Sequence, residues 1–293
     1  MSRILNNAGN YFDALFNPLK VRKVELLILR VAVFAFLVHL LIIFLGNNFT
    51  YFRHFQHSYL KAIYTPFSFI LFYEVFLLVI IIPKSISEFI GKQFEVITLI
   101  TLRSFFHDIA DLDLKNSIDI NNHEFINLLY DLCASLVMLG LTILYYRIYL
   151  NNRKSEIVGE LNNFINIKKI VSLSMILVLL LLSVTSFYNW SKEMIQALQL
   201  DQNYPDPNTV FYADFFSTMI FVDVFLLIIS FTYHFSFFTI FRNASFIITT
   251  ILIRMSLTIE KPMNYILILI GFLFAILSFF LYSIRTVNSK SKD

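Results

Sequence analysis

Cysteine, glycine and charged residues are scarce in this 293-residue sequence. The single cysteine excludes a disulfide framework and a zinc site built from cysteines. The six glycines form no phosphate-binding loop, no GxxxG helix-pairing motif and no GxSxG motif, and HExxH and CxxC are also absent. Charged residues make up 15% of the chain, against ~25% in soluble proteins. We therefore expect a protein that is not an enzyme and that uses no cofactor, no metal ion and no nucleic-acid partner.

Apolar residues are correspondingly abundant. They form 58% of the chain, the mean hydropathy is +0.71, and 34 phenylalanines and 15 tyrosines raise the aromatic share to 17%. A soluble protein of this length cannot bury so much apolar surface in a core, so the surrounding solvent must be lipid. The composition predicts an all-α integral membrane protein whose main partner is the lipid bilayer.

Six segments are each close to the ~20 apolar residues that a bilayer requires. They are residues 24–46, 63–83, 125–147, 170–190, 211–235 and 263–284. Two shorter segments, 94–110 and 243–259, each carry an arginine at the centre. The distribution of the basic residues indicates whether these two segments also cross the membrane.

Lysine and arginine are enriched in the cytoplasmic segments of membrane proteins. With eight spans and a cytoplasmic amino terminus, the inner segments hold 15 lysines and arginines and the outer loops hold five. With six spans, the numbers are 12 inside and 10 outside. The count favours eight transmembrane helices with both termini in the cytoplasm, and we expect the inner (plasma) membrane of a bacterium as the location.

Residues 1–23 precede the first predicted span. Apolar side chains such as Phe12 and Leu15 recur there at helical spacing, and polar residues such as Asn10 lie on the opposite side. This pattern is typical of an amphipathic helix that lies along the membrane surface, and Pro18 is expected to interrupt it.

Two stretches of the first half recur in the second half in the same order. "YEVFLLVIII" at 73–82 aligns with "VDVFLLIISF" at 222–231, and "ITLITLR" at 97–103 aligns with "ITTILIR" at 248–254. Each half contains four predicted spans, so both halves have the same orientation in the membrane. We expect an interfacial helix at 1–23, followed by two parallel four-helix repeats at 24–155 and 156–293.

The repeat places four charged residues inside the membrane. It pairs Glu74 with Asp223 and Arg103 with Arg254. Glu74 and Arg103 each lie nine residues from the inner end of their predicted helices, which places both ~13 Å from the inner face at ~1.5 Å per residue. An isolated charge at that depth costs ~2.5 to 3.5 kcal/mol, so the sequence predicts one acid–arginine ion pair in each half. These pairs line a polar pathway, or form a switch that breaks and reforms as ions, protons or voltage act on the bundle, or only lock adjacent helices together.

Two further polar residues fall inside predicted spans. His39 lies in the middle of the first span, where it either relays protons, binds a haem together with a second histidine, or is simply a hydrogen-bonded core residue. Asp131 lies in the fourth span and has no acidic counterpart in the eighth, so it is either a functional addition or a hydrogen-bonded core carboxylate.

An acidic cluster is expected at the outer surface, where it either concentrates cations near a pore mouth or is a solvated loop. Its members are Asp108, Asp111, Asp113 and Asp119. The glycine and the terminal glutamate of a calcium-binding loop are missing from this stretch, so no metal site is predicted there.

Residues 74–98 resemble the region between the second and third helices of voltage-sensor domains. Glu74 is followed nine positions later by Pro83, and "KQFEV" at 92–96 then begins the next helix with a basic, an aromatic and an acidic residue. The resemblance implies a four-helix domain in which Glu74 is the acidic countercharge of the second helix and Phe94 the aromatic at the start of the third. Thr98 occupies the position of the usual aspartate, and residues 125–146 carry no arginine ladder.

Two functions from different classes fit these patterns. The first is an ion or proton channel, or a secondary transporter, with a path near the four charges and with Asp131 and His39 as further candidates. The second is a non-catalytic membrane sensor or assembly subunit that binds another membrane protein. Either protein is compatible with a homo-oligomer.

Overall fold

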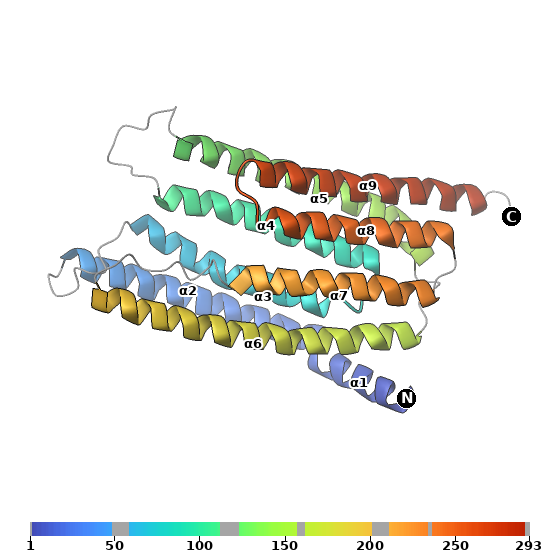
Figure 1. The fold of residues 1–293 in the computed structure, drawn as a ribbon, viewed down its shortest axis with the longest axis horizontal. Helices are drawn as coiled ribbons and strands as arrows, with labels where there is room; N and C mark the ends of the chain where they lie inside the picture. The colour runs from blue at the N-terminus through green and yellow to red at the C-terminus, as the bar shows by residue number, and fades with distance from the viewer. Residues whose placement is uncertain are drawn as a thin grey trace. The chain divides into compact units, whose positions relative to one another are not determined.

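The computed structural model describes residues 2–48, 59–111, 123–156, 162–200, 211–233 and 236–290. Over these residues the chain is helical and contains no strand. The elements are α1 (Ser2–Leu15), α2 (Pro18–Asn48), the short 3₁₀ helix η2 (Tyr59–Ile63), α3 (Tyr64–Ile80), α4 (Ile86–Asp111), α5 (His123–Glu156), α6 (Asn162–Leu200), α7 (Phe211–Tyr233), α8 (Phe237–Ser256) and α9 (Met263–Lys290) (Figure 1).

Six of these helices are long and apolar enough to cross a membrane, namely α2, α5, α6, α7, α8 and α9. Large apolar side chains such as Phe34, Leu181 and Phe221 point outward and are 67 to 77% exposed. Outward apolar side chains on long apolar helices are expected where the surroundings are lipid. The chain is therefore an α-helical integral membrane protein, as its composition predicts.

The two short predicted spans differ in outcome. Segment 243–259 falls largely in α8, which is among the six long apolar helices. Segment 94–110 falls in α4, which is helical but not among the six, and segment 63–83 corresponds to α3, whose apolar part is shorter. Eight spans remain a prediction, with α3 and α4 as the two helices in question.

Local sequence explains where the first helices begin and end. Asn17 precedes α2 and accepts a hydrogen bond from the backbone N–H of Leu19 at 3.3 Å, while Pro18 is the first residue of α2. Proline is favoured at that position because its nitrogen needs no helical hydrogen bond. The interruption expected at Pro18 is confirmed, since α1 ends at Leu15.

The connection between α3 and α4 is a short turn with a capping signal. Ser85 precedes α4, and its hydroxyl accepts a hydrogen bond from the backbone N–H of Glu88 at 3.2 Å. The sequence from Ser85 to Glu88 matches the S-x-x-E capping box that stabilises the start of a helix. The cap fixes the direction in which α4 leaves the turn.

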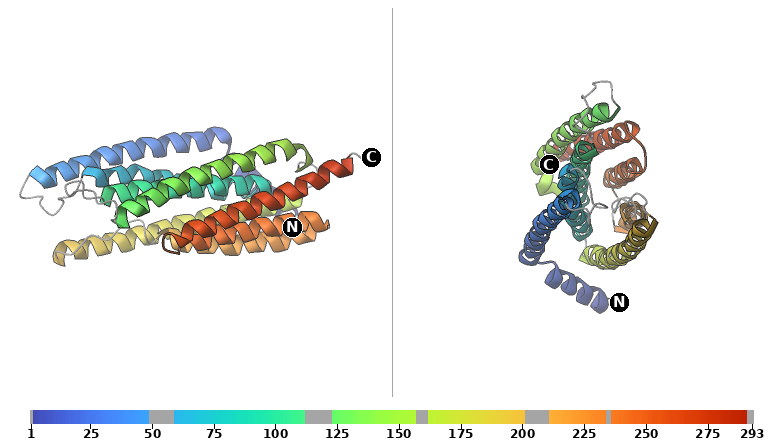
Figure 2. Two further views of the ribbon diagram at one scale, coloured as in Figure 1. Left: turned by 90° about the horizontal axis from the view of Figure 1, so that it is seen from above. Right: turned by 90° about the vertical axis from the view of Figure 1, so that its left-hand side faces the viewer.

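The described chain divides into two compact units. The first contains residues 1–13, 79–90 and 148–293. In it α7 packs between α6 and α8, and α9 packs on α8 (Figures 1 and 2). The start of α6 also contacts α1, because Lys169 Nζ lies 2.6 Å from a carboxylate oxygen of Asp13.

The second unit contains residues 14–78 and 91–147. His39 on α2 makes a 2.6 Å hydrogen bond with the hydroxyl of Thr65 on α3, and Phe67 on α3 stacks on Phe106 of α4 with ring centroids 4.4 Å apart. Helices α4 and α5 meet where Phe94 packs against Tyr145 at 5.1 Å. Each helix of this unit thus contacts its neighbour in the chain.

Candidate buried ion-pair site

A buried ion pair joins the middle of α7 to α8. Arg254 Nη1 lies 2.5 Å from Oδ2 of Asp223, and the two side chains are only 1% and 2% exposed. The hydroxyl of Thr250 donates a 2.9 Å hydrogen bond to the same oxygen. The ion pair predicted in the second half is confirmed.

The geometry of α8 explains why both residues reach one carboxylate. Thr250 and Arg254 are four residues apart, so they lie on the same face of the helix. Side chains in a helix point back toward its amino terminus, and the long arginine side chain therefore extends toward the level of Thr250. Asp223 lies ten residues before Tyr233, the last residue of α7, so the pair sits well inside the apolar part of the helix.

The pair leaves several polar atoms without a hydrogen-bond partner. Among the described residues, these are Asp223 Oδ1 and the Nε and Nη2 groups of Arg254, all of them buried. A buried polar group without a partner costs about 1–3 kcal/mol. The site therefore has unused hydrogen-bonding capacity on both the acid and the base.

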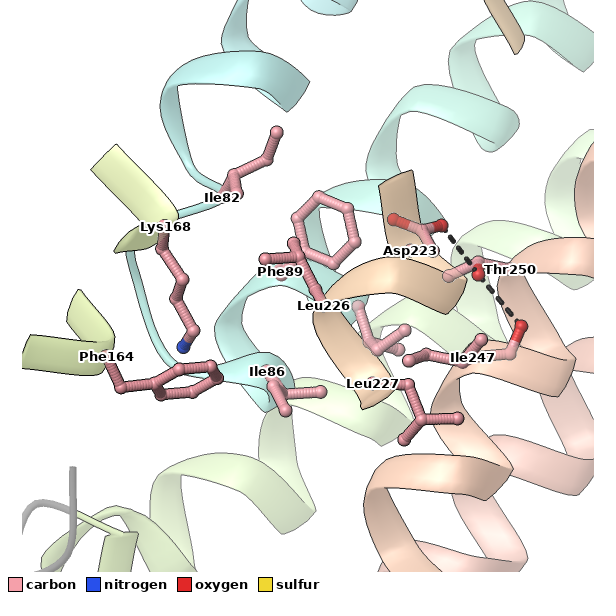
Figure 3. Close-up of a pocket in the computed structure, with 11 residues that line it drawn as sticks. Ile82, Ile86, Phe89, Phe164, Lys168, Asp223, Leu226, Leu227, Ile247 and Thr250 are labelled. Carbon is pink, nitrogen blue, oxygen red and sulfur yellow. Dashed lines mark hydrogen bonds between the residues drawn. The ribbon is translucent and has the colours of Figure 1, made fainter. Parts of the chain in front are cut away.

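A pocket adjoins the carboxylate of Asp223 (Figure 3). Its empty space, including the part open to the surroundings, is about 430 Å³. Its walls come from the α3–α4 connection, the start of α4, α6, α7 and α8. The lining is Ile82, Ile86, Phe89, Ile90, Phe164, Lys168, Asp223, Leu226, Leu227, Ile247 and Thr250. Figure 3 shows one oxygen of Asp223 bonded to Thr250 and the other turned toward the side of Phe89.

The pocket also holds a buried lysine that sequence reasoning missed. Lys168 is 2% exposed, its Nζ donates a 3.1 Å hydrogen bond to the carbonyl of Lys84, and it lies 4.5 Å from the ring centroid of Phe164. In the sequence, Lys168 belongs to a basic segment at the start of a predicted span. Only the fold brings it to the same pocket as Asp223.

In the first half, Glu74 is paired with Lys92 and not with Arg103, so the predicted Glu74–Arg103 pair is wrong. Lys92 Nζ lies 2.8 Å from Oε2 of Glu74. Glu74 is six residues before the end of α3 at Ile80, and Lys92 is six residues after the start of α4 at Ile86, so the two are level across the turn. Arg103 is eleven residues beyond Lys92, which is ~16 Å farther along α4 at ~1.5 Å per residue.

Lys92 belongs to a small polar network that reaches α5. Its Nζ also lies 2.8 Å from Oε2 of Glu95, and the hydroxyl of Tyr146 donates a 2.7 Å hydrogen bond to Oε1 of Glu95. Gly91 allows this approach, because a Cβ atom there would lie 2.9 Å from the hydroxyl oxygen of Tyr146. In the sequence, this network could have been anticipated only from the basic and acidic residues of "KQFEV" at 92–96.

The remaining predicted residues lie apart from these contacts. Arg103 is buried on α4 and Asp131 is fully buried on α5. His39 makes the hydrogen bond with Thr65 that its core interpretation expects. Of the outer acidic cluster, Asp108 is half-buried near the end of α4, the side chain of Asp111 is not among those described, and Asp113 and Asp119 lie outside the described residues.

Comparison with known proteins finds no matching family model, no matching curated protein and no matching solved structure. The class of this protein is therefore defined by its fold and its site alone. The chain is an α-helical integral membrane protein with an enclosed aspartate–arginine pair between two apolar helices.

Proposed function

We propose that the chain has eight transmembrane helices, with α3 and α4 joining the six long apolar ones. Helix α4 has 26 residues and is ~39 Å long at ~1.5 Å per residue, enough to cross the ~30 Å hydrocarbon layer. The excess of lysine and arginine in the inner segments supports this topology and two cytoplasmic termini. Helix α1 lies along the inner surface, and the membrane is the plasma membrane of a bacterium.

The proposed organisation is two parallel four-helix repeats, 24–155 and 156–293. Similar contacts at aligned positions support the duplication. Thr98 on α4 lies 3.3 Å from the hydroxyl of Thr142 on α5, and Thr249, which aligns with Thr98, donates a 3.3 Å hydrogen bond to the carbonyl of Gly271 on α9. The resemblance of residues 74–98 to voltage-sensor domains applies to the first repeat alone.

The proposed function is movement of ions or protons across the membrane, through a channel or a secondary-transport cycle. The observation that supports this function is the enclosed pair of Asp223 and Arg254, which lies beside a pocket that Lys168 also lines. Ionisable groups inside a membrane are costly, and they typically mark ion or proton pathways. In this role the pair is a switch, because breaking the contact changes the charge that faces the pathway.

The test is flux in liposomes that contain the purified protein. Asp223→Asn removes the negative charge and is expected to abolish flux. Asp214→Asn is the matched control, because Asp214 is an exposed aspartate on the same helix and flux is expected to persist. Equal flux in the wild type and Asp223→Asn would remove this carboxylate from the mechanism.

A sensor or assembly subunit is the second candidate. Helix α2 has 31 residues, of which only Ala32, Ile43 and Gly46 are buried, so most of its surface is left to lipid or to another membrane protein. This function predicts no flux for any ion and a stable membrane-protein partner after mild detergent extraction. A wild-type protein that is folded but carries no ion would favour it over transport.

A further inference from the structure

The pocket beside Asp223 discriminates between the ions that such a site would take. It offers one carboxylate and one hydroxyl, from Asp223 and Thr250, and its third polar group is the ammonium of Lys168. The rest of the lining is hydrocarbon. A metal cation that loses its water needs several oxygen ligands, six to eight for calcium and a ring of carbonyls in potassium channels. This lining does not supply them.

Water fits the same place. Asp223 Oδ1 is a buried acceptor without a partner among the described residues, and it is turned away from Thr250 toward the side of Phe89. The centre of a water-sized sphere can reach about 30 Å³ of this pocket, and one water molecule needs ~10–15 Å³ of such space, so the pocket has room for one or two water molecules. Water that donates a hydrogen bond to Oδ1 removes the cost of the unpaired oxygen.

On the basis of the proposed transport function, we infer that the transported ion is the proton and that water in this pocket delivers it to Oδ1 of Asp223. A hydronium ion in the pocket gives up one proton: one of its O–H bonds breaks, an O–H bond forms at Oδ1, and a neutral water molecule remains. The carboxylate becomes a neutral carboxyl group. Arg254 keeps its charge, because arginine is not deprotonated in proteins.

Protonation then changes the site in a defined way. The 2.5 Å contact between Arg254 and Oδ2 loses its electrostatic attraction, and the guanidinium becomes an uncompensated buried charge. Arg254 from α8 is the charged group that contacts Asp223, whereas the ammonium of Lys168 from α6 lines the same pocket and is bonded to the carbonyl of Lys84. The α3–α4 connection and the start of α4 contribute only apolar side chains to the pocket. The neighbouring guanidinium of Arg254 favours return of the proton to water, so uptake is reversible.

The first experiment compares ions in one preparation. Liposomes of phosphatidylcholine and phosphatidylglycerol with an internal pH-sensitive dye report proton flux, and the same vesicles report sodium and potassium flux with tracer ions. We expect proton flux alone, and loss of that flux to the level of protein-free vesicles in Asp223→Asn. Sodium or potassium flux without proton flux would overturn the inference while leaving the transport function standing. Absence of all flux would overturn both.

The second experiment tests the pocket without relying on transport. A Cys133→Ser background removes the single native cysteine, and Ile247→Cys then places a thiol in the pocket lining. We expect a small charged thiosulfonate to label Ile247→Cys in folded protein, because the pocket holds water. Ile248→Cys is the control, since Ile248 is 47% exposed on the outward surface of α8 and should react slowly in lipid, where few thiolates form. Failure to label Ile247→Cys in folded protein would overturn the water-filled pocket.

A third variant narrows the pocket while leaving the charges in place. Ile247→Phe adds volume to a buried pocket wall, and we expect slower proton flux at an unchanged level of folded protein. Ile248→Phe makes the same change one residue farther along α8, on the exposed side, and should transport like the wild type. If both variants carry protons at the wild-type rate, the pocket is not the route.

Discussion

Thr250 and Arg254 both contact Oδ2 of Asp223, at 2.9 and 2.5 Å, from two positions four residues apart on α8. One oxygen therefore receives a neutral donor and a charged one, while the other oxygen of the same carboxylate has no partner among the described residues. This asymmetry leaves one buried oxygen of Asp223 able to accept a further hydrogen bond.

Removing one member of the pair should be costly. Asp223→Ala leaves the guanidinium of Arg254 buried without its carboxylate, and we expect a loss of about 3–5 kcal/mol of stability. The double variant Asp223→Leu, Arg254→Met removes both charges and should lose much less. Thermal unfolding in detergent, followed by circular dichroism, measures the difference. Equal losses in the two proteins would mean that the charges do not depend on each other.

The hydrogen bond from the hydroxyl of Thr250 can be tested without changing the shape of the side chain. Thr250→Val keeps the branched side chain but removes the donor to Asp223, and we expect a loss of about 1.5–3 kcal/mol because the acceptor is charged. Thr258→Val is the control, since Thr258 is exposed and bonds only to the backbone carbonyl of Met255. The same thermal measurement applies, and unchanged stability in Thr250→Val would show that the hydrogen bond contributes nothing.

Two glycines in neighbouring helices should respond to alanine in opposite directions. At Gly91 a Cβ atom would lie 2.9 Å from the hydroxyl oxygen of Tyr146, so Gly91→Ala should displace that ring and lose about 1–3 kcal/mol. At Gly140 nothing lies within 4 Å of a Cβ atom, so Gly140→Ala should gain about 0.5–1 kcal/mol from helix propensity. A gain at both positions would contradict the packing of Tyr146 on Gly91.

The network around Lys92 should be redundant. Its ammonium lies 2.8 Å from both Glu74, which is buried, and Glu95, which is partly exposed. Glu95→Gln alone should cost no more than about 1 kcal/mol, because the pair is partly exposed. Glu74→Gln alone leaves Lys92 paired with Glu95. The double variant should lose more than the two single variants together. If the stability loss of the double variant equals the sum of the two single losses, Lys92 does not couple Glu74 to Glu95. Glu88→Gln, which affects only a more exposed pair with Lys84, is the control.

Hydropathy predicted the apolar helices well, because a lipid-facing helix has to be apolar over its whole length. It also placed Asp223 and Arg254 together, since each lies inside a long apolar segment and an isolated charge there is costly. The Glu74–Arg103 prediction in the first half was wrong because the depths of the two residues were counted from Pro83 and Phe94. In the structure, α3 ends at Ile80 and α4 begins at Ile86. With those helix ends, Glu74 is level with Lys92.

Other members of the sites had no signal in the sequence. In the sequence, Thr250 cannot be told apart from the other small polar residues of its apolar helix. Lys168 likewise cannot be told apart from the other basic residues of the inner segments. Their roles depend on which helices pack together, which a periodic pattern does not specify. The capping box at Ser85 was a local signal for the turn between α3 and α4. The sequence did not show that this turn lines the pocket, because that position depends on tertiary structure.

That turn makes the carboxyl-terminal half of the chain incomplete by itself. Residues 79–90 cluster with α6 to α9, although the chain on either side of them belongs to the other unit. A fragment that starts after residue 156 would lack the Lys84 carbonyl that binds Lys168, and Ile82 and Phe89 would be missing from around Asp223. Residues 79–90 therefore complete the surroundings of the Asp223–Arg254 pair from outside the carboxyl-terminal half of the sequence.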